Sequence, residues 1–118
     1  MRQEPTPATA RQVLDRAMSE ADFQHVVIRL ARYRGWHVVH SRPSRSKDGS
    51  WSTPIQGDPG APDLLLARAG VVLHVELKRE GGYLSSDQRA WRDAIGESYR
   101  LWRPRDWDEI AATLGAKT

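Results

Sequence analysis

The sequence predicts one α/β domain in which a small mixed β-sheet is flanked by helices. Three observations predict this class. Apolar residues recur at three- and four-residue spacing between residues 20 and 34, two apolar runs at 64–67 and 71–77 are separated by a short turn, and helical patterns alternate with a strand in the last third of the chain. The 118 residues are enough for one hydrophobic core and too few for two. The predicted order is α-β-β-β-α-β-α.

The domain is expected to begin at its first helix. Ser19 can cap this helix, and Gly35 can end it. The first ten residues hold two prolines and little that is apolar. Residues 1–18 are therefore predicted to be a partly flexible lead-in, with a short helical turn over 11–17, and the single domain is predicted over 19–115.

A strand and a long loop are expected next. Residues 36–40, with the sequence WHVVH, are aromatic and β-branched and predict a strand. Residues 41–60 are rich in Ser, Pro and Gly and show no sustained period. Loops of this length in compact domains are usually functional or disordered, so a long basic loop is predicted here.

The second half of the chain predicts a hairpin followed by an α-β-α unit. The runs 64–67 and 71–77 are close enough to pair as antiparallel strands. A helix over about 86–95, capped by Ser85 or Ser86, then leads to a strand at 99–102 and a final helix over 104–114. Because a helix joins them, the strand at 99–102 is expected to run parallel to the preceding strand.

Charged residues lie where this hairpin should be buried. Asp63 directly precedes the first apolar run, and Glu76 and Lys78 interrupt the second. Residues two apart in a strand point to the same face, about 7 Å apart, so the hairpin gathers two carboxylates and one ammonium group. Carboxylates held close together favour a cation between them, and oxygen ligands suit Mg²⁺ or Mn²⁺. Spacing alone also allows a surface Glu76–Lys78 ion pair, with Asp63 capping a turn.

A resemblance to a known family gives this pattern more weight. The run GAPDLLLARAGVVLHVELKRE, residues 60–80, resembles the PD-(D/E)xK nuclease signature. The surrounding sequence resembles the VRR-NUC family, whose small stand-alone members occur in phages. Further matches are SEADFQ, GW, GYLSSDQRAW and YRLWRPRDWDEI, and together they extend from Ser19 to Leu114.

The resemblance implies a restriction-endonuclease-like core and a metal-dependent DNA endonuclease related to Holliday-junction resolvases. The implied cofactor is Mg²⁺ or Mn²⁺, with no small organic cofactor. The residues it implies are the metal ligands Asp63 and Glu76 with the backbone carbonyl of Leu77, the catalytic Lys78, and Gln88 beside the active site.

The first helix of this superfamily often adds another acidic residue. Glu20 and Gln24 are the two candidates, one helical turn apart. Gln24 is nearer to the position of the glutamate in related resolvases, and there the chain departs from the pattern. Glu20 can also be an ordinary first-turn acid.

DNA is the expected partner. The net charge is only +3, but residues 29–47 carry several arginines and a lysine with no acidic residue between them. Arg42, Arg45 and Lys47 are expected to contact phosphates. Trp51 can stack on an unpaired base, or it can anchor the loop on its own domain.

Composition limits the other classes. With no cysteine in the chain, disulfides and thiolate zinc sites are excluded, and a cytoplasmic location is expected. No apolar run is long enough to span a membrane. The resemblance and the small size favour a two-fold homodimer. The alternatives are a non-catalytic DNA-binding module and a nuclease subunit that is active only with a partner.

Overall fold

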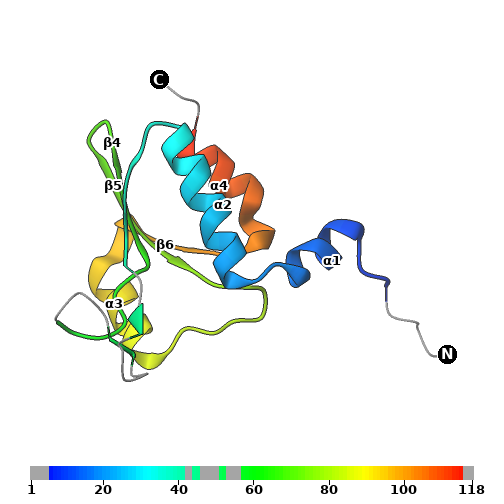
Figure 1. Cartoon of the computed structure of the whole chain (residues 1–118), viewed down its shortest axis with the longest axis horizontal. Coiled ribbons are helices and arrows are strands. Elements are labelled where there is room, and N and C mark those ends of the chain that lie inside the picture. The colour runs from blue at the N-terminus through cyan, green and yellow to red at the C-terminus, as the bar shows by residue number, and fades with distance from the viewer. Residues whose placement is uncertain (1–5, 42–43, 46–50, 53–56, 116–118) are drawn as a thin grey trace.

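A four-stranded mixed sheet is the frame of the molecule (Figure 1). The computed structural model describes residues 6–41, 44–45, 51–52 and 57–115, and for 44–45 and 51–52 it describes the backbone alone. The strand order is β1-β4-β5-β6. These strands are β1 (His37–His40), β4 (Leu64–Arg68), β5 (Val71–Leu77) and β6 (Tyr99–Trp102).

The β4–β5 hairpin fixes the register of the sheet. Leu64 pairs with Val75, and Arg68 pairs with Val71 across the turn. The two turn residues, Ala69 and Gly70, have φ values of 50° and 81°. A two-residue turn with positive φ at both positions matches the twist of antiparallel strands. The predicted hairpin is confirmed, and so is the predicted parallel pairing of β5 with β6.

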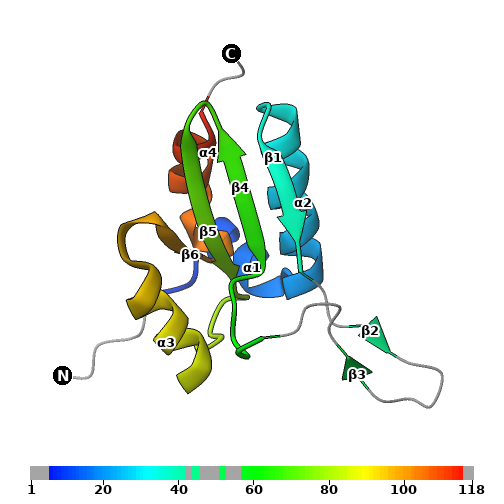
Figure 2. The ribbon, with the colours of Figure 1, turned by 90° about the vertical axis from the view of Figure 1, so that its left-hand side faces the viewer.

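Helices cover both faces of the sheet (Figures 1 and 2). α2 (Glu20–Tyr33) and α4 (Trp107–Leu114) lie side by side on one face, and α3 (Ser86–Ile95) lies on the other. Short 3-10 turns, η1 (Gly96–Ser98) and η2 (Pro104–Asp106), flank β6. The α/β class with a mixed sheet is therefore confirmed. Within the described residues, no helix combines the length and the apolar character needed to cross a membrane.

The core lies between the sheet and the α2–α4 pair. Alternate residues of β4 and β5 point into it, and both helices contribute one apolar face. Its members are Phe23, Val27, Ala31, Trp36, Leu64, Leu66, Leu73, Val75, Leu77, Trp102, Ile110 and Leu114.

Two segments differ from the prediction. Residues 10–17 form a full helix, α1 (Ala10–Ala17), where only a turn was expected. Thr9 and Gln12 form a capping box at its start, and the Arg11 guanidinium lies 3.3 Å from an Asp108 carboxylate oxygen. The lead-in is therefore held partly by local capping that periodicity does not reveal.

The stretch predicted as a loop over 41–60 contains two short strands. β2 (Ser44–Arg45) and β3 (Trp51–Ser52) pair antiparallel, with Arg45 opposite Trp51. Two-residue strands are too short to produce an alternating pattern, so the sequence gives no sign of them.

The two faces of β4 provide a test of the core. Leu66 is fully buried, whereas its neighbour Leu65 points to the other face and is 39% exposed. Leu66→Ala should lower the free energy of unfolding by about 2–5 kcal/mol. Leu65→Ala, the matched control, should lower it by less than about 1 kcal/mol. Urea denaturation measures both, and equal losses would contradict the assigned register.

Candidate functional site

Six segments meet at one end of the sheet. The hairpin topology places the start of β4 beside the end of β5, and the parallel pairing brings the end of β6 to the same edge. β1 also ends there, because His40 pairs with Leu64. The first turns of α2 and α3 lie at this end as well (Figure 2). This end of the sheet therefore collects side chains from distant parts of the sequence.

Asp63 ties this end together. It directly precedes β4, and its Oδ2 accepts a hydrogen bond from the Leu77 N–H at 2.9 Å. Its own carbonyl accepts a hydrogen bond from the Ser41 N–H at 2.9 Å. Asp63 thus joins the start of β4 to the last residue of β5 and to the residue after β1, and its carboxylate is held in one place.

Glu76 is the buried carboxylate of the site. It is 2% exposed, and among the described residues no other polar or charged residue is buried. Its side chain points to the face of the sheet that α3 covers, because it alternates with the core residues Val75 and Leu77. Gln88 Nε2 donates a hydrogen bond to Glu76 Oε1 at 3.1 Å, and Lys78 Nζ lies 3.7 Å from the same oxygen.

Burial and the neighbouring carboxylate together favour a protonated Glu76. Burial raises the pKa of Glu76 to about 8, the neighbouring charge of Asp63 raises it further, and Lys78 opposes the shift. Burial also raises the pKa of Asp63, against the hydrogen bond from Leu77. Two close carboxylates share a proton because both cannot be charged at low cost. A cation can replace that proton.

Lys78 is held beside this pair. Its backbone N–H donates to the Trp102 carbonyl at 3.1 Å, which extends the β5–β6 pairing by one residue. Its side chain is 16% exposed. A Cβ atom at Gly82 would lie 3.5 Å from both Cβ and Cδ of Lys78, so the lysine stem packs against the backbone of Gly82. The ammonium group therefore has a defined position next to Glu76.

Gln88 links the start of α3 to the carboxylates. Its Oε1 accepts from the Ser85 N–H at 2.8 Å, and its own N–H donates to Ser85 Oγ at 3.1 Å. This capping box fixes the first turn of the helix. The remaining amide group, Nε2, is the one that donates to Glu76. One side chain thus caps the helix and orients a buried carboxylate.

The segment that leads to Asp63 packs closely on α3. Gly60 has a φ of 94°, and a Cβ atom there would lie 2.6 Å from the Asp87 carbonyl carbon. Only glycine fits this approach. The Trp91 indole N–H donates to the Pro59 carbonyl at 3.0 Å. These contacts hold the chain three residues before Asp63 against the helix that carries Gln88.

The Leu77 carbonyl also faces Asp63. The N–H and C=O of one strand residue point to the same edge of the strand. The Leu77 N–H meets Asp63 Oδ2, so its carbonyl points to the same side. The oxygen atoms at this edge that could bind a metal ion thus come from two carboxylates and one carbonyl.

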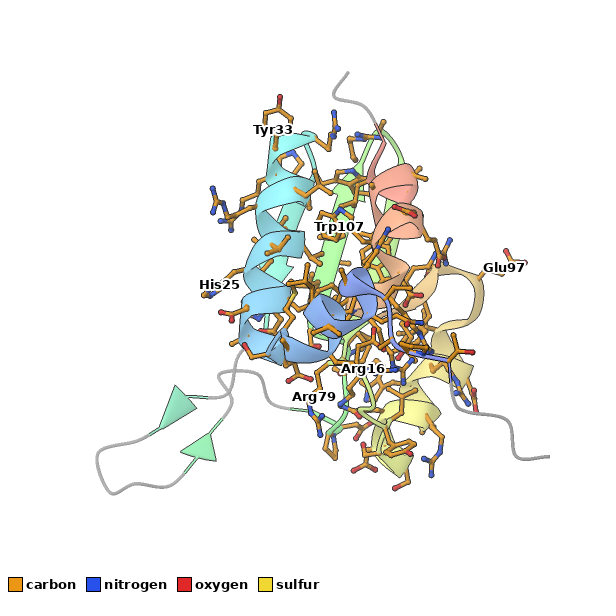
Figure 3. The ribbon with its side chains drawn as sticks, turned by 90° about the vertical axis from the view of Figure 1, so that its right-hand side faces the viewer. Arg16, His25, Tyr33, Arg79, Glu97 and Trp107 are labelled. Atoms are coloured by element: carbon orange, nitrogen blue, oxygen red, sulfur yellow. The ribbon has the colours of Figure 1, made fainter. Side chains whose placement is uncertain are left out.

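Of the two first-helix candidates, Glu20 is linked to the site by charge. Burial raises the pKa of Glu20, and the Lys78 charge lowers it. The Asp63 charge raises this pKa further, and the Arg79 charge lowers it. Arg79 lies at the same end of the molecule (Figure 3). Gln24 lies one turn further along α2 and is half-buried. The acidic first turn of α2 therefore lies within electrostatic reach of the pair.

Tyr99 is a site neighbour that the sequence analysis missed. It pairs with His74, two residues before Glu76 on the same face of the sheet. Burial and the Glu76 charge raise its pKa to about 12, and within the described part of the chain its hydroxyl has no hydrogen-bond partner. Only the β5–β6 register reveals this neighbour, because no local motif spans residues 76 and 99.

The residues predicted to contact DNA fall largely outside the described structure. Arg42 and Lys47 are not among the described residues. Arg45 and Trp51 face each other in the β2–β3 backbone pairing, and their side chains lie outside the described structure.

The donor set suits a hard divalent cation. Among the described residues, no group of three or more His, Asp or Glu side chains is arranged to hold a metal ion. Two carboxylates and a carbonyl leave several positions for water and phosphate, and Mg²⁺ usually keeps such positions in phosphate-binding sites. The buried, proton-sharing pair fits a cation of this kind better than a structural metal cage.

Comparison with known proteins gives no assignment. Models of protein families, curated proteins and solved structures all give no match to this chain.

The raised pKa of Glu76 predicts a pH-dependent stability. Between about pH 4.5 and about pH 8, the metal-free folded protein keeps a proton that the unfolded chain has lost, so its free energy of unfolding should fall as the pH rises. The free energy of unfolding of the Glu76→Gln variant should fall less over this window, because a glutamine side chain does not titrate. Urea denaturation with a chelator at about pH 5 and about pH 8 measures the difference.

Glu97 provides the control, because it is exposed and extends away from the molecule (Figure 3). Glu97→Gln should follow the wild type at both pH values. Parallel curves for the wild type and Glu76→Gln would mean that Glu76 holds no extra proton.

Proposed function

We propose that this protein is a metal-dependent DNA endonuclease of the VRR-NUC family, with a restriction-endonuclease-like core. The observation that carries the proposal is the cluster of Asp63, Glu76 and Lys78. A carboxylate that is 2% exposed lies beside a second carboxylate and an ammonium group, 3.7 Å from the lysine nitrogen. Perturbed titratable groups gathered at one end of a sheet favour a catalytic role over a surface ion pair.

Mg²⁺ or Mn²⁺ would be held by Asp63, Glu76 and the Leu77 carbonyl. Gln88 Nε2 and Lys78 Nζ both approach Oε1 of Glu76, so the second carboxylate oxygen can serve the cation. When bound, the cation would supply a water of lowered pKa and neutralise charge on a phosphate oxygen.

The side chains around the cation would orient the reaction. Lys78 brings a positive charge to the position where a phosphate gains negative charge during hydrolysis. Gln88 fixes the Glu76 carboxylate from the α3 side, and the capping box at Ser85 fixes Gln88. Glu20 lies close enough to influence the charge of the site, and Gln24 remains the alternative on the same helix.

The proposed substrate is branched or duplex DNA. The basic segment with Arg42, Arg45, Lys47 and Trp51 would contact it, and phosphate contacts of this kind carry no sequence information. A structure-selective, Holliday-junction-resolvase-like activity fits a small domain of this type.

We also propose a two-fold homodimer, which would present two sites to a symmetric junction. Light scattering that gives a monomer mass at working concentration would contradict the dimer.

A cleavage assay tests the proposed function. Labelled four-way junction, flap and linear duplex DNA are incubated with Mg²⁺ or Mn²⁺. The wild type should cleave at least one of them, and Lys78→Ala should lower the rate by about 100-fold or more. Arg16→Ala is the matched control, because Arg16 is an exposed cation in the last turn of α1, outside the basic stretch over residues 29–47, and it should retain the wild-type rate.

The alternatives give different results in this assay. Tight DNA binding without metal-dependent cleavage by the wild type would favour the non-catalytic module. Cleavage that appears only when a partner protein is added would favour the partner-dependent subunit. Equal rates for the wild type and Lys78→Ala would contradict the role of the lysine.

A further inference from the structure

The loop between β5 and α3 displays an aromatic side chain to solvent. Tyr83 is 88% exposed, more than any other large hydrophobic side chain in the described part of the chain. In the sequence it lies between Lys78, the first residue of this loop, and Gln88, in the first turn of α3, and both of these residues approach Oε1 of Glu76. An exposed aromatic ring therefore lies within the segment that forms the site.

The loop is held firmly around this ring. The Gly82 N–H donates to the Arg79 carbonyl at 3.1 Å, and Arg103 Nη2 donates to the Gly82 carbonyl at 2.8 Å. On the other side, Arg89 Nη1 donates to the Leu84 carbonyl at 2.9 Å. Both neighbours of Tyr83 are thus fixed by hydrogen bonds, and its exposure is a property of a defined loop conformation.

The backbone that carries Tyr83 lies close to Lys78. The backbone of Gly82 packs on the stem of Lys78, with a would-be Cβ atom 3.5 Å from Lys78 Cδ. The Cα atom of Tyr83 follows that of Gly82 at about 3.8 Å. A DNA strand whose phosphate lies beside Lys78 would therefore bring the adjoining nucleobase within reach of the Tyr83 ring.

We propose that Tyr83 stacks on an unpaired nucleobase next to the phosphate that the site cleaves. This inference rests on the proposed nuclease function. Base–aromatic stacking tolerates any base, because each base has a π-face, and the loop holds the ring ready without further ordering. In intact duplex DNA both faces of a base are covered by its neighbours. Tyr83 thus selects DNA in which a base is unpaired at the cleavage position.

Substitution of both partners tests the contact. The cut in flap DNA is mapped first, and the unpaired nucleotide beside it is then made either thymidine or an abasic residue. The wild type should cleave the thymidine substrate about tenfold faster than the abasic one. Tyr83→Ala should cleave both at the slower rate, whereas Tyr83→Phe and Tyr83→Trp should keep the preference. Fluorescence anisotropy of the same DNA in Ca²⁺ should show the same pattern in affinity.

Tyr33→Ala is the matched control. Tyr33 is also an exposed tyrosine, at 66%. It is the last residue of α2 and lies at the end of this helix away from the site (Figure 3). This variant should keep the wild-type preference for thymidine. If Tyr83→Ala keeps that preference while Lys78→Ala still lowers the cleavage rate, the stacking role is wrong and the nuclease stands. If the wild type cleaves no DNA, the proposed function fails and the role of Tyr83 fails with it.

Discussion

The burial of Glu76 is the constraint on which this end of the molecule depends. A carboxylate that is 2% exposed needs a proton, a hydrogen-bond donor or a cation. Gln88 and Lys78 approach it, but Asp63 adds a second negative charge and makes the arrangement more costly. An apolar side chain at this position would cost less. Stability therefore does not explain the pair, whereas the proposed binding of a divalent cation would.

The turn at the far end of the hairpin determines the geometry of this pair. Ala69 and Gly70 set the β4–β5 register, and the next position after the Leu64–Val75 pair places Asp63 beside Glu76. A slip of one residue would turn Glu76 to the core face and Leu77 to α3. The hydrogen bond from the Leu77 N–H to Asp63 then fixes the open end. The fold and the site are specified by the same pairing.

Local signals in the sequence predicted most of the fold and the centre of the site. Ser19 and Ser85 mark helix starts through their caps, and alternating apolar residues mark the hairpin, so the gathering of Asp63 with Glu76 follows from pairing alone. The features that were missed depend on distant contacts, on very short elements or, for α1, on local capping that periodicity does not reveal. Tyr99 joins the site only through the register of β6, and the β2–β3 pair is too short to leave a pattern.

Calorimetric titration of the metal-free protein with Mn²⁺ at neutral pH is the most direct test of the account. Performed in two buffers with different ionisation enthalpies, it gives both the affinity and the number of protons released. Because the pKa of Glu76 is raised to about 8, binding should release about one proton per ion, and Glu76→Gln should release fewer and bind more weakly. Absence of binding, or binding without proton release by the wild type, would contradict the assignment of Asp63 and Glu76 as the metal site.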